Sequence, residues 1–303
     1  MAQTLEGLSR RTETMQSIRG IVRTMKTMSA INAAPYERAA EAIDDWRDTV
    51  LDALHAFLRC NGPLSRASGA DPQRALIVMG SDHGLCGNYN ELLAHEVTLG
   101  PNMAQAKVIC VGAQLEDALM GEGITPIATL LPPANTDGLI RLASQLITRL
   151  DAMRAKLDAD DLVVHLVYTQ RGAHGLQSPV TQALLPIDPD LLDALAQQPW
   201  VSRSLPHFSM PAPDLLASLV HNLVFATLYR AAAEALVTEN AARLARMQQA
   251  EQSVDEKLED LRSETRSVRQ SEITTELLDV IVGFEALKGR ERRRKRNDRR
   301  LRE

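Results

Sequence analysis

Residues 214–282 read DLLASLVHNLVFATLYRAAAEALVTENAARLARMQQAEQSVDEKLEDLRSETRSVRQSEITTELLDVIV and contain neither proline nor glycine. A helix of this length would extend about 100 Å, at about 1.5 Å per residue, whereas the usual helix has about 11–12 residues. Pro211 and Pro213 precede the stretch, and Asp214 is placed to cap its first turn. The stretch therefore predicts one very long helix, and this helix decides the architecture.

Further along the stretch, the apolar residues narrow to a seam with a period of seven. Leu244 and Leu258 lie three residues before two members of the series Met247, Val254, Leu261 and Val268. Two apolar positions per heptad with charged flanks are typical of a coiled coil. Since so long a helix is not stable alone, it needs a partner helix.

The other end of the chain shows the same period. Leu8, Met15 and Val22 are spaced by seven, and the pattern resumes after Pro35 as far as residue 62. Proline removes a backbone donor and clashes with the preceding turn, so we expect it to kink or interrupt this helix. The two terminal segments, 1–62 and 213–287, are therefore predicted to form an antiparallel two-stranded coiled coil.

The middle of the chain, residues 72–210, has a different pattern. Short apolar runs typical of buried strands alternate with helical segments. The expected strands are 74–80, 106–112, 161–169 and a shorter one within 124–130, and the expected helices are 88–98, 113–121 and 137–158. Such alternation predicts a mainly parallel α/β (Rossmann-like) domain inserted between the two long helices.

The stretch SDHGLCGN, residues 81–88, is the part that most resembles a catalytic or binding loop. It lacks the lysine and spacing of a phosphate-binding loop and the glycine pattern of a dinucleotide site. Cys86 beside His83 could be a nucleophile with its base, but no separate orienting carboxylate accompanies them. A metal site from Cys86, His83 and Asp82 matches no common ligand spacing. The favoured interpretation is a structural turn between a strand and a helix.

Charge is distributed unevenly along the chain. The formal net charge is −5, yet residues 288–303 contain ten basic and three acidic side chains, a net of +7 that leaves −12 for the remainder. We expect 288–303 to be a disordered, solvated tail; an RNA-binding arm or a membrane tether is the alternative. No run of about 18 apolar residues is free of charge, so we expect no membrane span. Three widely spaced cysteines favour a reducing cytoplasm.

Five motifs, in order along the chain, resemble the gamma subunit of F-type ATP synthases. They are SIRGIVRTMKTMSAINA (17–33), SDHGLCGNYN (81–90), QSPVTQALLP (177–186), TENAARLARMQQA (238–250) and VRQSEITTELLDVIVGFEAL (268–287). The turn signature comprises Ser81, Asp82, His83, Gly84, Leu85, Cys86 and Gly87. By the same resemblance, the residues at the contact between rotor and stator would be Lys26, Met28, Arg243, Arg269, Gln270, Thr274 and Glu276.

The resemblance implies a central-stalk rotor that couples ion-driven rotation of the c ring to ATP synthesis or hydrolysis. The implied partners are the alpha and beta subunits, the epsilon subunit and the c ring. The chain itself would catalyse no reaction and hold no cofactor or metal. It would lie at the cytoplasmic face of the bacterial inner membrane, as part of the F1 sector, with no nucleic-acid partner.

The sequence also departs from the family pattern. His83 stands where the family has arginine, Asn88 replaces a glycine, and Pro35 and the basic extension are unusual. These departures indicate a divergent subtype. Two other classes of function remain open from the residues: a cysteine-dependent α/β enzyme that uses Cys86 and His83, and a coiled-coil scaffold with a basic RNA-binding tail.

Overall fold

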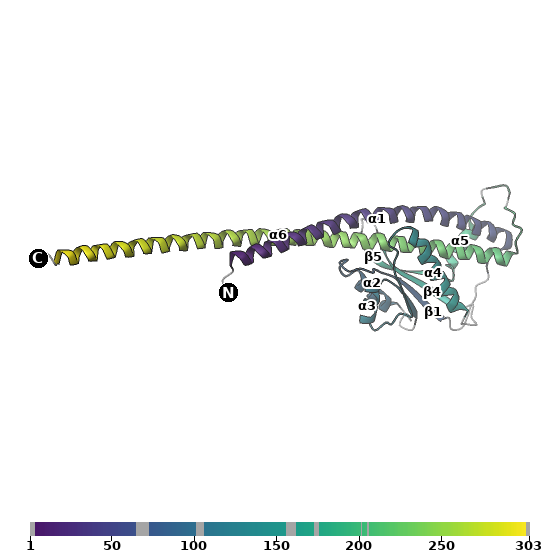
Figure 1. The fold of residues 1–303 in the computed structure, drawn as a ribbon. Helices are drawn as coiled ribbons and strands as arrows, with labels where there is room; N and C mark the ends of the chain where they lie inside the picture. The colour runs from purple at the N-terminus through teal and green to yellow at the C-terminus, as the bar shows by residue number, and fades with distance from the viewer. Residues whose placement is uncertain are drawn as a thin grey trace. The chain divides into compact units, whose positions relative to one another are not determined.

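The computed structural model describes residues 4–64, 73–100, 106–155, 162–172, 176–200, 202–204 and 206–300. Two long helices, α1 (Leu5–Asn61) and α6 (Ala212–Arg300), stand at the two ends of the chain, and an α/β part lies between them in sequence (Figure 1). The chain divides into two compact units, Met1–Met25 with Met247–Glu303, and Lys26–Arg246. Each long helix contributes to both units. The predicted fold class, an α/β domain with long terminal helices, is confirmed.

In the first unit, the beginning of α1 packs antiparallel against α6. Arg19 Nη2 donates to Asp255 at 3.2 Å and Arg23 Nε donates to Glu251 at 3.1 Å, so the numbers rise along one helix as they fall along the other. The buried seam consists of Leu8, Val22, Met247, Leu258 and Leu261. Ion pairs this exposed add little stability, so the apolar seam holds the pair together and the charges fix its register.

Pro35 does not interrupt α1, contrary to the expectation from sequence. The helix runs unbroken from Leu5 to Asn61. The heptad series also continues past the proline, because Ser29, Tyr36, Val50 and Phe57 are all buried. Pro35 itself lies on the exposed side of the helix. The carbonyl that loses its partner, that of Ile31, can therefore be hydrated, which lowers the cost of an internal proline.

The α/β part is a five-stranded sheet of order β3-β2-β1-β4-β5. Its strands are β1 (Gln73–Met79), β2 (Lys107–Val111), β3 (Ala128–Leu130), β4 (Leu162–Arg171) and β5 (Gln177–Leu185). The first four are parallel to one another and correspond to the predicted runs, whereas β5 is antiparallel to β4 and was not predicted. Pro179 obscured it in the sequence; an edge strand tolerates proline because one side has no ladder.

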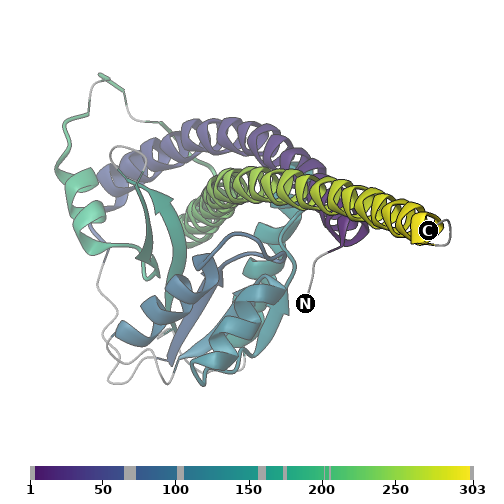
Figure 2. The same cartoon turned by 90° about the vertical axis from the view of Figure 1, so that its left-hand side faces the viewer.

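Helices cover both faces of this sheet (Figure 2). The connecting helices are α2 (Tyr89–Leu99), α3 (Ala113–Gly121), α4 (Asp137–Arg154) and a short α5 (Pro189–Gln197), of which the sequence predicted all but α5. Successive side chains of a strand point to opposite faces. In β1, Leu76 and Val78 pack with α2 and α3, while Ala75, Ile77 and Met79 pack with α4, α6 and α1. One segment of α6, residues 231–240, is buried at every position.

Both ends of α6 differ from the predicted ones. The helix begins at Ala212, so Asp214 lies in its first turn and does not precede it as the cap. It also continues beyond residue 287 to Arg300, where we expected a disordered tail. Arginine, lysine and glutamate are strong helix formers, and the lone Gly289 costs only about 1 kcal/mol.

By length and composition alone, α6 contains a stretch within Ala212–Arg290 that is apolar enough to cross a membrane, which the sequence had not led us to expect. A core helix passes the same test. About a third of that stretch is buried, and Leu228, Ala231 and Ala233 of α6 are fully buried against the sheet in the second unit.

Candidate functional site

The signature turn, residues 81–88, connects β1 to α2 and is held by buried polar bonds. Ser81 N donates to Asn90 Oδ1 at 3.0 Å, and Asn90 Nδ2 donates to Ser81 Oγ at 2.8 Å. Ser81 Oγ in turn donates to the carbonyl of His83 at 3.1 Å. Both Ser81 and Asn90 are buried, and each polar side chain has partners. A buried polar network of this kind fixes one conformation of the backbone.

Cys86 and His83 do not form a nucleophile and base. Cys86 is 4% exposed, and its Sγ lies 3.4 Å from Ser81 Oγ and 3.8 Å from the carbonyl of His83, not from the imidazole. The imidazole is 81% exposed and pairs with Asp82 at 3.2 Å. Asp82 also accepts from the N–H of Ala113, so it caps α3 and not α2. The geometry favours the structural turn predicted from sequence.

Two glycines that flank the turn, Gly80 and Gly112, make it possible, although no structural role was predicted for either. Gly112, at the end of β2, has φ of +112°, and a Cβ there would lie 2.4 Å from the carbonyl oxygen of Ser81. At Gly80, a Cβ would meet Leu115 Cβ at 2.6 Å. Only glycine allows so close an approach, of a neighbouring backbone at Gly112 and of packed side chains at Gly80. The sequence signal was present, because each glycine directly follows an apolar strand.

Arg243 of α6 binds the same turn. Arg243 donates through Nη2 to the carbonyl of His83 at 3.2 Å and through Nε to that of Gly84 at 3.4 Å. Its Nη2 also donates to Glu239 at 2.6 Å. The pKa of Glu239 is raised because burial disfavours its charged form, an effect that Arg243 opposes. Because Arg243 binds main-chain carbonyls, histidine in place of the family's arginine at position 83 leaves this contact intact.

Arg243 was assigned by resemblance to the contact between rotor and stator, together with six other residues. Its side chain is 13% exposed and directed at the turn. Met28 is 56% exposed, and Lys26 and Met28 belong to the second unit. The remaining four, Arg269, Gln270, Thr274 and Glu276, are exposed on α6 in the first unit. The structure contains no partner chain, so their role stays a prediction.

The end of α6 exposes a set of large apolar side chains. Every residue from 271 to 285 is exposed. Between residues 273 and 287, eight large apolar side chains are between 50% and 70% exposed: Ile273, Leu277, Leu278, Val280, Ile281, Val282, Phe284 and Leu287. We call this set the apolar tip. The sequence identified this motif by resemblance, but its exposure follows only from the structure. Contiguous exposed apolar surface marks an interaction site.

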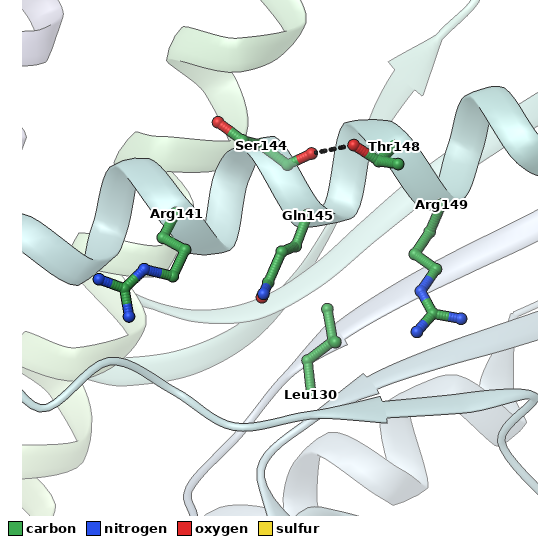
Figure 3. A pocket seen from close by; sticks show the side chains of 6 residues that line it. All are labelled: Leu130, Arg141, Ser144, Gln145, Thr148 and Arg149. Atoms are coloured by element: carbon green, nitrogen blue, oxygen red, sulfur yellow. Dashed lines mark hydrogen bonds between the residues drawn. The ribbon is translucent and has the colours of Figure 1, made fainter.

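A shallow hollow of about 260 Å³ lies between β3 and α4. Figure 3 shows Arg141, Gln145 and Arg149 extending from α4 toward the side where Leu130 lies. Ser144 and Thr148 complete the lining, which contains no carboxylate, histidine or cysteine. The lining therefore offers no general base that could activate the hydroxyl of Ser144 or Thr148 as a nucleophile. Among the described residues, no cluster of three or more histidine, cysteine or acidic side chains could hold a metal ion.

Known proteins resemble this chain along nearly its whole length. A family model described as ATP synthase matches residues 4–287. The chain belongs to the ATP synthase gamma chain family. The gamma chain of Lachnoclostridium phytofermentans is 27% identical over 297 residues, which cover 93% of this chain and 99% of the relative. The gamma chain of Verminephrobacter eiseniae is 30% identical over 242 residues, which cover 78% of each.

A solved structure shares the fold of this chain. It is a chain of the Euglena gracilis mitochondrial ATP synthase rotor, with a TM-score of 0.61 and 15% identity, covering 89% of this chain and 98% of that one. Family membership places the chain in the F1 sector of an ATP synthase, peripheral to the membrane. Neither the matched relatives nor the geometry of the turn supports a cysteine-dependent enzyme or an RNA-binding scaffold.

Proposed function

We propose that this chain is the non-catalytic central-stalk rotor of an F-type ATP synthase. In this role it couples rotation of an ion-driven c ring to ATP synthesis or hydrolysis in a ring of alpha and beta subunits. The observation that carries the proposal, beside family membership, is the apolar tip. Eight large apolar side chains on one uncovered helix require a partner surface, and a ring of subunits around the helix can cover all its sides.

The helix pair of the first unit suits the transmission of torque. Its apolar seam joins two helices along their length, and each long helix continues without a break into the second unit. A twist applied to one helix is shared with the other through the seam and the crossed ion pairs of Arg19 and Arg23. Paired helices resist bending and twisting better than one helix does.

The tip suits rotation within a sleeve. Apolar contact is non-directional and depends on area rather than on the alignment of particular atoms. A tip that contacts its sleeve through leucine, isoleucine and valine can therefore change partners without breaking strong, directional bonds. By resemblance, Arg269, Gln270, Thr274 and Glu276 would supply the few polar contacts with a beta subunit. Thr274 Oγ1 already donates to the carbonyl of Gln270 at 2.8 Å, so contact with a partner through this hydroxyl would require it to rotate or to accept.

The α/β part would be the foot of the rotor, in contact with an epsilon subunit and the c ring. We place the complex at the cytoplasmic face of a bacterial inner membrane, because the curated relatives named above are bacterial chains. Contact with the membrane would then occur only through the complex. The chain would need no bound nucleotide, metal or cofactor of its own.

Co-expression with alpha and beta subunits of the source organism tests the proposal. We expect a complex with three alpha, three beta and one gamma chain, whose ATPase activity depends on this chain, measured by native mass spectrometry and ATP hydrolysis. The variant Cys86→Ala/His83→Ala should retain full activity, since neither side chain takes part in chemistry. A chain that remains alone when the subunits are co-expressed would contradict the proposal.

A further inference from the structure

We propose that Arg171, at the end of β4, is the positioning residue that locks the α/β part of the second unit to both long helices. The inference rests on the proposed rotor function and deepens it, because it assigns the point at which torque passes between the sheet and the helices. Resemblance to the family did not single out this residue.

The guanidinium of Arg171 contacts both helices. Its Nε donates to Glu234 Oε1 of α6 at 2.9 Å, and its Nη2 donates to Glu234 Oε2 at 3.2 Å. The backbone N–H of Arg171 also donates to Glu234 Oε1, at 3.1 Å. Its Nη1 donates to Glu37 of α1. One side chain thus joins a strand of the sheet to α1 and α6.

Glu234 of α6 depends on its contact with Arg171. The Glu234 side chain is only 6% exposed, so it has little access to water and depends on its partner. Burial alone would raise the pKa of Glu234, but the bonds from Arg171 lower it below its ordinary value. The same bonds raise the pKa of Arg171. Both groups therefore remain charged at neutral pH, and the contact persists there.

The geometry of these bonds is directional, in contrast to the packing around them. A guanidinium that donates two parallel bonds to one carboxylate fixes distance and orientation together. The apolar core between the sheet and α6, which includes Leu228 and Leu236, is held by non-directional contacts. A second directional bond joins β4 to α6, from Thr238 Oγ1 to the carbonyl of Thr169 at 3.2 Å, but it does not reach α1. Arg230 and Asp44 form a further bridge, at 2.6 Å, but it joins α6 to α1 without a strand. Arg171 is therefore placed to stop the sheet from shifting along the helices.

The test uses the complete membrane-reconstituted synthase, in which ion pumping and ATP hydrolysis are measured together. We compare Arg171→Leu, Arg171→Lys and Glu37→Gln with the wild type. The control is Arg149→Gln, an exposed cation on α4 with the same loss of charge as Arg171→Leu. Thermal unfolding of each complex is recorded as well.

For Arg171→Leu we expect ATP hydrolysis within about twofold of wild type and ions pumped per ATP reduced about fivefold, because directional bonds to both helices are lost. Arg171→Lys keeps the charge but cannot donate two parallel bonds to Glu234. The number of ions pumped per ATP should therefore lie between the values for Arg171→Leu and the wild type. Glu37→Gln, which leaves the Glu234 pair in place, should lower the ratio about twofold. Arg149→Gln should not change it.

An unchanged pumping ratio in assembled Arg171→Leu would overturn the inference, even if thermal stability fell, since a merely structural residue changes stability alone. If Arg171→Leu does not assemble, unchanged ratios in both Arg171→Lys and Glu37→Gln would overturn it equally. A wild-type complex that hydrolyses ATP without pumping ions, or does not form, would refute the rotor function itself. Those two failures are therefore distinguishable.

Discussion

Two segments of the same helix each reverse the usual relation between polarity and burial. Residues 231–240 of α6 are buried at every position, although they include Glu234, Thr238, Glu239 and Asn240. Residues 271–285 are exposed at every position, although they include most of the apolar tip. We call the first segment the buried decade. Polar residues lie inside and apolar residues lie outside, the reverse of the usual arrangement.

The difference separates two mechanical tasks. The polar groups of the buried decade have fixed partners: Glu234 binds Arg171, Glu239 binds Arg243, and Thr238 accepts or donates in bonds with Tyr89 and the carbonyl of Thr169. Such bonds hold one orientation, as a joint to the α/β part requires. The apolar tip has a cation–π contact of Lys288 with Phe284, within the same helix, and its exposed apolar side chains suit a contact that slides.

The largest difference between the buried decade and the apolar tip is expected when one leucine in each is truncated to alanine. Leu236→Ala in the buried decade should lower the free energy of unfolding by about 3 kcal/mol, because it leaves a cavity in the core. Leu278→Ala in the tip, where the side chain is 55% exposed, should change it by less than about 0.5 kcal/mol. Urea denaturation of the isolated chain measures both. Equal losses would mean that the tip is packed in the free chain.

A smaller effect is expected from removal of one buried hydroxyl. Tyr89 donates to the carbonyl of Ala235 at 2.9 Å and lies 3.0 Å from Thr238 Oγ1. Tyr89→Phe should cost about 1–2 kcal/mol, since buried acceptors lose their partner. The measurement is again urea denaturation, with near-ultraviolet circular dichroism to show that the core is retained. No loss of stability would mean that the bond between α2 and the buried decade contributes nothing.

The two acids of the buried decade should respond to pH in opposite directions. The pKa of Glu239 is raised above its ordinary 4.5, so its contribution favours the fold at low pH and is lost as pH rises through the folded value. The pKa of Glu234 is lowered, so its contribution is present above 4.5 and is lost as pH falls through the folded value.

Urea denaturation of Glu239→Gln and Glu234→Gln across pH 3 to 8 tests these signs. Relative to wild type, Glu239→Gln should gain stability as pH rises above 4.5. Glu234→Gln should lose stability relative to wild type as pH rises through the folded pKa of Glu234 toward 4.5, and the difference should stay constant above 4.5. Parallel curves for the two variants would contradict the assigned environments.

A substitution in the apolar tip should have the smallest effect on the free energy of unfolding but a clear effect on assembly with alpha and beta subunits. Ile281→Ser in the apolar tip should leave unfolding within about 0.5 kcal/mol of wild type. It should weaken assembly with alpha and beta subunits about tenfold, because burial of one large apolar side chain contributes about 1.5–3 kcal/mol. Assembly is followed by titration and size-exclusion chromatography. Arg262→Ser, an exposed substitution in the same helix, serves as the control.

Features with a local sequence signal were predictable. The seven-residue period of Leu8 and Val22 gave the helix pair, and the apolar runs around Ile77 and Ile109 gave the parallel strands. The features that were missed depend on tertiary surroundings. Pro35 is tolerated because its side of α1 faces solvent, and β5 forms because β4 offers it an edge. Arg171 ends a strand like many other polar residues, and only the fold brings Glu234 and Glu37 to it.

The most direct test of the rotor is observation of rotation itself. Cys60 is an exposed thiol at the end of α1, whereas Cys86 and Cys110 are buried, so a probe can be attached to Cys60 selectively. The assembled complex is immobilised through its beta subunits, and single probes are followed when ATP is added. We expect stepwise rotation in one direction that stops when ATP is removed. A probe that stays still while the complex hydrolyses ATP would contradict it.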